Sequence, residues 1–219
     1  MSENKRNYQK ELDRIIDSIK EKSIRPKLLL HACCAPCSSY CLEYLSQYFD
    51  ITIYYYNPNI EPEEEFDYRV SELKRLISEM PEAAGVKLVV PMYDNSEFKN
   101  VVKGLEEEPE RGARCTVCYS LRLRKTAEYA AEYGFDYFST TLSISPYKDA
   151  DRLVSLGEHF AKVYGVCYLT SDFKKRNGYK RSIELSEEYK LYRQDFCGCI
   201  YSKRETEAKR NVCENQPNT

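Results

Sequence analysis

Short apolar segments alternate with longer amphipathic ones along most of the chain. Apolar runs with the length of buried strands lie at 27–32, 51–56, 87–93 and 136–142. Helical spacing of apolar residues predicts helices near 37–48, 61–79, 95–104, 118–133 and 149–163. Such alternation is typical of a parallel sheet with crossover helices. At 219 residues, the pattern predicts a single Rossmann-like (nucleotide-hydrolase-like) α/β domain with flanking helices.

The two ends of the chain differ from this pattern. Leu12, Ile15, Ile16 and Ile19 recur at helical spacing, which predicts a helix over 5–22 within an N-terminal extension, 1–26. The domain then spans 27–202, and the polar stretch 203–219 is expected to be a mobile tail. The charged first twenty residues do not resemble a secretory signal, and no apolar run approaches the roughly 20 residues that cross a bilayer. We therefore expect a cytoplasmic protein without a membrane partner.

A cysteine motif follows the first apolar strand directly. The segment His31-Ala-Cys33-Cys34-Ala-Pro-Cys37 stands where nucleotide-binding folds often carry a glycine-rich phosphate loop. Ligands of parallel sheets bind outside the carboxyl ends of the strands, at the switch in strand order. The motif is expected at that place, and the missing phosphate loop removes the usual support for a nucleotide-dependent reaction.

A second motif, Cys115-Thr-Val-Cys118, is expected to precede a helix that begins near Tyr119. The positive helix end, together with Arg111 and Arg114, would favour the thiolate form that binds metals. With Cys33 and Cys34 it can supply four thiolates to one metal centre. Both iron–sulfur clusters and structural zinc use four cysteines, and adjacent cysteines fit an iron–sulfur cluster better than a zinc knuckle. Zinc remains an alternative.

The other cysteines fall into two kinds. Cys197-Gly-Cys199 is a third motif, in which a strained and reducible disulfide would act as a redox element; two unpaired thiols are the alternative. Cys41 and Cys167 are expected in the core. Ten cysteines in a chain expected to be intracellular favour metal binding or redox chemistry over a structural disulfide framework.

Charge is distributed in local patches, since the formal net charge is only −2. The stretches 111–125 and 174–181 each carry five lysines or arginines and no acid, whereas 61–67 and 106–110 are acidic. Such runs are either solvated faces or local sites for nucleic acid. Interleaved aromatic and basic groups would suit RNA; the expected RNA-binding residues are Lys174, Lys175, Arg176, Tyr179, Lys180, Arg181, Tyr192 and Arg193.

Five ordered blocks carry a family resemblance. They are HACCAP, YNPNIEPEEEFDYR, RCTVCYSLRL, FSTTLSISPYKD and DFKKRNGYKRSIELSEEYKLYRQDFCGC. From about residue 27 to 202 the chain resembles the cobalamin-independent epoxyqueuosine reductases. The resemblance implies the final step of queuosine biosynthesis, in which the epoxide of epoxyqueuosine in tRNA is reduced to the alkene with release of water.

The same resemblance implies the cofactors and their ligands. A 4Fe-4S cluster would be held by Cys33, Cys34, Cys115 and Cys118, with a second, mononuclear iron beside it. Cys197 and Cys199 would be the redox-active pair. If Cys37 bound the cluster, Cys33 or Cys34 would be free for the second iron. The implied partners are the anticodon loop of tRNA and an unidentified electron donor.

Proton donation to the departing oxygen would fall to Asp149, Tyr147 or Tyr119, although Asp149 is equally well placed as a helix N-cap. Two other functions remain open. A tRNA thiolation enzyme could use similar clusters but would require ATP, and a zinc protein could bind RNA without catalysis.

Overall fold

A five-stranded parallel sheet forms the centre of the molecule. The structure is a computed structural model, and it describes residues 6–214, with side chains through residue 211. The strands are β1 (Lys27–His31), β2 (Asp50–Tyr54), β3 (Lys87–Val89), β4 (Tyr137–Thr140) and β5 (Cys167–Tyr168). Their order in the sheet is β3-β2-β1-β4-β5, and all neighbours run parallel. The predicted α/β fold is confirmed.

Burial on both faces explains the continuous apolar run of β1. This strand lies between β2 and β4, and Leu28, Leu29 and Leu30 are completely buried. Leu28 and Leu30 pack into one apolar cluster, whereas Leu29 packs into another on the opposite face. A parallel strand covered by helices on both faces has no solvent-facing positions, so alternation disappears.

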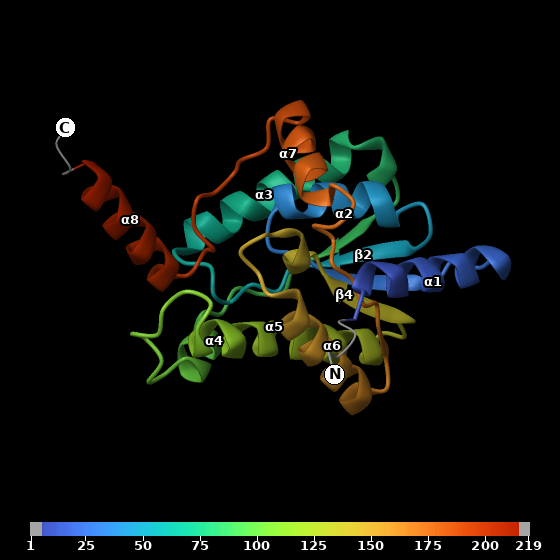
Figure 1. Cartoon of the computed structure of the whole chain (residues 1–219), viewed down its shortest axis with the longest axis horizontal. Coiled ribbons are helices and arrows are strands. Elements are labelled where there is room, and N and C mark those ends of the chain that lie inside the picture. The colour runs from blue at the N-terminus through green and yellow to red at the C-terminus, as the bar shows by residue number, and fades with distance from the viewer. Residues whose placement is uncertain (1–5, 215–219) are drawn as a thin grey trace, which may run out of the picture.

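Helices cover the two faces of the sheet (Figure 1). The clusters place α1, α2 and α3 on one face, where α7 packs against α2, and α5 and α6 on the other. Their bounds are α1 Tyr8–Glu21, α2 Ala35–Leu45, α3 Glu63–Glu79, α4 Ser96–Val101, α5 Ala113–Glu132, α6 Ala150–Tyr164, α7 Gly178–Glu188 and α8 Ile200–Glu214. Two short 3₁₀ helices, Pro81–Ala83 and Thr141–Ile144, complete the order. Figure 1 shows α8 projecting away from the sheet.

The strand order reverses between β1 and β4. From β1 the chain builds outward to β2 and β3, and it then returns to the other side of β1 with β4 and β5. His31 and Thr140 are register partners at the carboxyl ends of the two central strands. The cysteine motif that follows β1 therefore lies at the switch point, as the sequence predicts.

Some expectations need correction. Helix α5 begins at Ala113 and not near Tyr119, because the chain turns at Gly112, the N-cap, and continues directly into helix. Cys41 is buried as predicted, but Cys167 is exposed. The reason is that β5 is a two-residue edge strand, and Cys167 is on its solvent side.

The terminal extensions are described only in part. The predicted N-terminal helix is confirmed over Tyr8–Glu21, and residues 1–5 lie outside the described residues. Most of the stretch 203–219 belongs to α8, which runs to Glu214, while 215–219 lie outside the described residues. The mobility of that tail stays a prediction. None of the helices in the described part of the chain is both long and apolar enough to span a membrane.

Candidate metal and redox site

Three cysteines converge at the carboxyl end of β1. Cys33 and Cys34 follow the strand, and Cys37 lies in the first turn of α2, where Pro36 occupies an N-terminal helical position. The three sulfur atoms all lie within 4.8 Å of one another, and those of Cys33 and Cys34 are 3.7 Å apart. Three thiolates at this spacing can hold a metal ion. The third member, Cys37, is the residue whose role the sequence left open.

Hydrogen bonds among these sulfur atoms give the three thiols different pKa values. Contacts from Cys33 and Cys37 lower the pKa of the Cys34 thiol well below its ordinary value. Hydrogen bonds with Cys33 and Cys34, together with burial, raise the pKa of Cys37 well above its ordinary value. Cys34 is therefore the first of the three thiols to lose its proton. A metal cation would be needed to ionise all three.

Four further cysteines line a hollow beneath α5. Cys115 and Cys118 come from the first two turns of α5, and Cys197 and Cys199 from the segment between α7 and α8. The backbone N–H of Arg111 donates to Cys115 Sγ at 3.2 Å, and that of Ser202 to Cys199 Sγ at 3.4 Å. The other lining residues are Asn59, Phe98, Glu110, Arg114, Tyr119 and Ser202.

Burial outweighs the helix terminus at Cys115 and Cys118. Desolvation raises the pKa of both thiols, that of Cys118 to about 11. Arg114 helps little because its guanidinium is directed to the carbonyl oxygen atoms of Glu106 and Glu108 and to the carboxylate of Glu205. Arg111 and Arg114 do lower the pKa of Cys115, as expected, but burial outweighs them and the pKa is raised overall.

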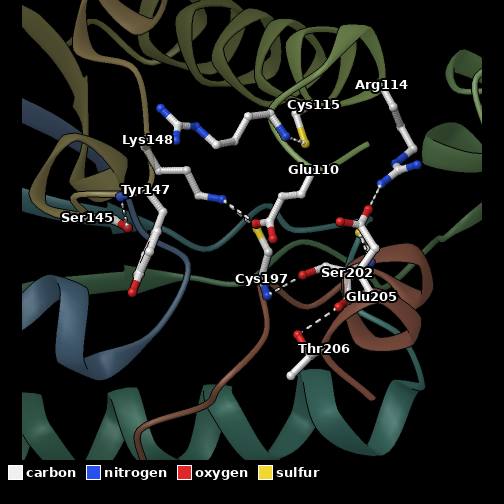
Figure 2. Close-up of polar contacts among 12 residues, drawn as sticks. Glu110, Arg114, Cys115, Ser145, Tyr147, Lys148, Cys197, Ser202, Glu205 and Thr206 are labelled. Carbon is white, nitrogen blue, oxygen red and sulfur yellow. Dashed lines mark hydrogen bonds and ion pairs between the residues drawn. The ribbon is translucent and has the colours of Figure 1, made fainter. Parts of the chain in front are cut away.

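Lys148 joins this hollow, although no motif in the sequence singles it out. Its Nζ lies 3.1 Å from Cys197 Sγ and 3.4 Å from a carboxylate oxygen of Glu110 (Figure 2). The centroid of the Tyr119 ring is 5.8 Å from the same nitrogen. Burial lowers the pKa of Lys148, but the Cys197 sulfur and Tyr119 raise it well above its ordinary value overall. The lysine side chain is therefore a buried cation. The sequence feature that could have pointed to Lys148 is its position beside Tyr147 in the block SPYKD.

A second buried cation, Arg122 of α5, lies between the two cysteine groups. It interacts electrostatically with Cys118, Cys33 and Cys197. Its Nε donates to Nε2 of His31 at 3.2 Å, and Nη2 donates to Oδ1 of Asn57 at 2.6 Å. His31 Nε2 also lies 3.2 Å from the carbonyl oxygen of Tyr56, and Nδ1 lies 2.9 Å from Thr140 Oγ1. Burial and the positive charge of Arg122 lower the pKa of His31 to about 3, so the imidazole is neutral.

The three candidate proton donors occupy different environments. Tyr119 is buried in the lining of the hollow, and desolvation raises its pKa, so its hydroxyl retains its proton. Tyr147 is 66% exposed, and Figure 2 shows its ring directed away from Cys197. Asp149 is the N-cap of α6, accepting from Arg152 N at 3.2 Å. Of the three, the structure brings only Tyr119 to the cysteines.

Many of the predicted RNA-binding side chains already have partners. Arg176 pairs with Asp13 and Arg181 with Glu43, both at 2.6 Å. Tyr192 donates to Glu65. Lys174 pairs with Asp172 and Lys180 with Glu184, and Tyr179 is half-buried. Within residues 6–211, Lys175 and Arg193 are exposed and have no carboxylate partner. The patch is thus less positive than its sequence indicates.

These features define a cysteine-rich α/β protein with a candidate metal site at the switch point of a parallel sheet. A family model described as epoxyqueuosine reductase QueH matches residues 28–205. The chain therefore belongs to the QueH epoxyqueuosine reductase family.

Individual relatives bear the same name. The chain is similar to epoxyqueuosine reductase QueH of Streptococcus pyogenes serotype M1, with 46% identity over 200 residues, covering 90% of this chain and 78% of that protein. The Staphylococcus epidermidis protein of that name is 44% identical, over 92% of this chain and 87% of its own. The Thermotoga maritima protein of that name is 31% identical, over 83% and 93%. The sequence resemblance is thus confirmed.

Proposed function

We propose that this chain is an epoxyqueuosine reductase, an oxidoreductase of queuosine biosynthesis that acts on tRNA and uses its buried cysteines for metal binding and redox chemistry. The proposed activity rests on family membership. The observation that carries the chemistry is the convergence of Cys33, Cys34 and Cys37 at the sheet edge, close to a hollow with four more cysteines.

The donor set suits an iron–sulfur centre. Cys33, Cys34, Cys115 and Cys118 are its proposed ligands, with Cys37 as a fifth thiol for the centre or for an adjacent iron. Four thiolates and inorganic sulfide make a buried anion, which needs nearby donors and positive charge. Three buried nitrogen atoms have no hydrogen-bond partner and could donate to such an anion: Arg122 Nη1, Arg69 Nη2 and Arg114 Nε. The described residues therefore fit such a group.

When bound, the metal centre supplies electrons one at a time and a Lewis acid for the epoxide oxygen. The chain supplies the other requirements. Tyr119 is the proposed proton donor to the departing oxygen, because it retains its proton and lines the hollow. Cys197 and Cys199 are the proposed redox pair. Their oxidation to a disulfide releases two electrons and two protons, which balances reduction of one epoxide to an alkene and water.

Metal analysis tests this proposal. Anaerobically purified protein should be brown, contain iron and sulfide, and convert epoxyqueuosine to queuosine in tRNA, as measured by mass spectrometry of the nucleosides. Serine at Cys34, Cys115 or Cys118 should reduce the iron content and abolish conversion. Cys167→Ser is the matched control, because Cys167 is exposed on β5, and it should behave as wild type.

A colourless protein with one zinc ion, unable to convert the substrate, would contradict the reductase proposal. That outcome would favour the rival function, a zinc protein that binds RNA without catalysis.

The tRNA surface is proposed to include the segment 174–181 and residues Tyr192 and Arg193. Replacing Lys174, Lys175, Arg176 and Lys180 together by Gln should weaken tRNA binding, and the log–log slope of affinity against salt should fall by about one unit for each phosphate that is no longer neutralised. Lys175→Gln alone should produce much of the loss of tRNA binding and of salt dependence, since Lys175 is exposed and has no carboxylate partner in the described part of the chain. Lys162→Gln on α6, across the sheet, is the control. An unchanged salt slope would reject this surface.

A further inference from the structure

Three arginines are almost completely buried around the cysteines. Arg69, Arg114 and Arg122 are each 1% to 2% exposed. Arg69 pairs with Glu65 at 2.6 Å and Arg114 with Glu205 at 3.1 Å. Among the described residues, Arg122 has no carboxylate partner. Its guanidinium is the buried charge that the fold leaves without compensation.

The hydrogen bonds that the geometry assigns to Arg122 go to neutral groups, and its further interaction with Cys118 is with a thiol whose pKa is raised by burial. His31 and Asn57 receive hydrogen bonds from Nε and Nη2, and they orient the guanidinium without offsetting its charge. Nη1 is buried and has no hydrogen-bond partner. An uncompensated buried cation is strongly destabilising. The fold therefore retains a positive charge and a free donor at a position that requires an anion.

The ionisable groups that interact with Arg122 are sulfur atoms, which become negative when they bind a metal. Arg122 interacts with Cys118, which is one turn earlier on α5, and with Cys33 and Cys197. These cysteines come from three separate parts of the chain, and they belong to both groups of the site. A guanidinium close to these cysteines can interact with a metal centre that both cysteine groups bind.

We propose that Arg122 is the positioning residue and positive counter-charge of the metal centre, with Nη1 donating to a sulfur of the bound group. This inference rests on the metal centre proposed above. Reduction adds negative charge to the centre, and a buried cation nearby favours that change. Arg122 therefore makes the centre easier to reduce and holds it more tightly. Asn57 and His31 keep the guanidinium in place.

The test is a redox titration of the metal-loaded full-length protein, followed by visible absorption and EPR. Arg122→Gln should shift the midpoint potential to more negative values and release iron to a chelator about 10- to 100-fold faster. Arg122→Lys keeps the charge and should retain most of the wild-type potential. Lys125→Gln is the matched control, because it removes one positive charge from the same helix at a more exposed position. Its potential should equal that of the wild type.

A purely structural role for Arg122 makes a different prediction. Loading with metal should raise the melting temperature of the wild type more than that of Arg122→Gln. A structural role would lower the melting temperatures of the free and loaded forms equally. If Arg122→Gln does not fold, Asn57→Asp replaces it, bringing a carboxylate to Nη2 at the expense of the hydrogen bond from Asn57 Nδ2 to Ala32 O. This variant should also lower the potential.

The outcomes separate the two proposals. Loaded Arg122→Gln or Asn57→Asp with the wild-type potential and the wild-type rise in melting temperature would overturn the role of Arg122 alone. Wild-type protein that binds no metal would overturn the metal centre and this inference together.

Discussion

The turn that carries Cys33 and Cys34, with Cys37 just after it in α2, and the segment that carries Cys197 and Cys199 are held in different ways. The turn continues β1, with Ala32 N bonded to Tyr54 O at 3.2 Å, and it leads directly into α2. The segment lies between α7 and α8 and has no regular structure through residue 199. The contacts that hold this segment in place come largely from side chains.

Contacts with α3 hold this C-terminal segment. Arg75 donates to the carbonyl oxygen atoms of Tyr189 and Lys190, and Glu72 accepts from Tyr192 N at 3.0 Å. We therefore expect the turn to share the stability of the sheet, and the segment to open without unfolding of the sheet. This difference would suit the proposed metal centre and the proposed redox pair beside it.

Truncating the core beneath each region should have the largest effect. Leu30→Ala in β1 removes a completely buried side chain and should lower the free energy of unfolding by about 2–5 kcal/mol in urea titrations. Leu191→Ala, at the start of the segment, should lower it less and should mainly accelerate amide exchange over 189–199. Equal losses in the two variants would show that the segment is as integral to the core as β1.

Gly198 is the position at which the segment tolerates a side chain least. Its φ is +121°, and an added Cβ would lie 2.9 Å from Ile60 Cγ1 and 3.2 Å from Arg69 Nη1. Gly198→Ala should cost about 1–3 kcal/mol and increase the rate at which Cys199 is alkylated. Gly104→Ala is the control, since Gly104 also has positive φ but open space around it. If Cys199 is alkylated at the same rate in both variants, the close contact at Gly198 does not hold the segment.

Lys148 links the segment to the hollow through Cys197. Its ammonium stabilises the negatively charged sulfur that reacts with iodoacetamide, so Lys148→Gln should slow alkylation of Cys197 about tenfold at neutral pH. Mass spectrometry of the labelled peptide measures the rate. Lys148→Arg keeps the charge and should react at close to the wild-type rate; a slow Arg variant would point to packing in place of charge.

Glu72 should give the smallest effect. Glu72→Gln weakens the hydrogen bonds to Arg75 and Tyr192 N and should cost about 1 kcal/mol, detected as faster amide exchange over 189–199 with the sheet unaffected.

The same contact should depend on pH. The hydrogen bond from Arg75 and that from Tyr192 N lower the pKa of Glu72 below its ordinary value of 4.5. Its stabilising contribution is therefore complete above pH 4.5 and is lost as the pH falls through the lowered folded-state pKa. Exchange over 189–199 should accelerate across that window in the wild type more than in Glu72→Gln, after correction for intrinsic rates. Parallel profiles would contradict this.

Several functional residues were recognisable only in part from the sequence. The cysteine motifs, Tyr119 and the family blocks were identifiable because each is a local pattern. Arg122 was included in a basic stretch, 111–125, whose charge was read as a site for nucleic acid or a solvated face, yet its guanidinium is buried. Cys37 was ambiguous because spacing along the chain does not show which sulfur atoms meet.

Local periodicity determined four of the five strands, all but the two-residue β5, most of the helices and the position of the first cysteine motif at a strand end, because burial on one or two faces sets the spacing of apolar residues. Tertiary structure alone decided the trio of Cys33, Cys34 and Cys37, the hollow shared by Cys115, Cys118, Cys197 and Cys199, and the partners of the buried cations. Arg122 and His31 are 91 residues apart, and Lys148 and Cys197 are 49 apart. Contacts of that kind depend on strand order and helix packing, which no local pattern encodes.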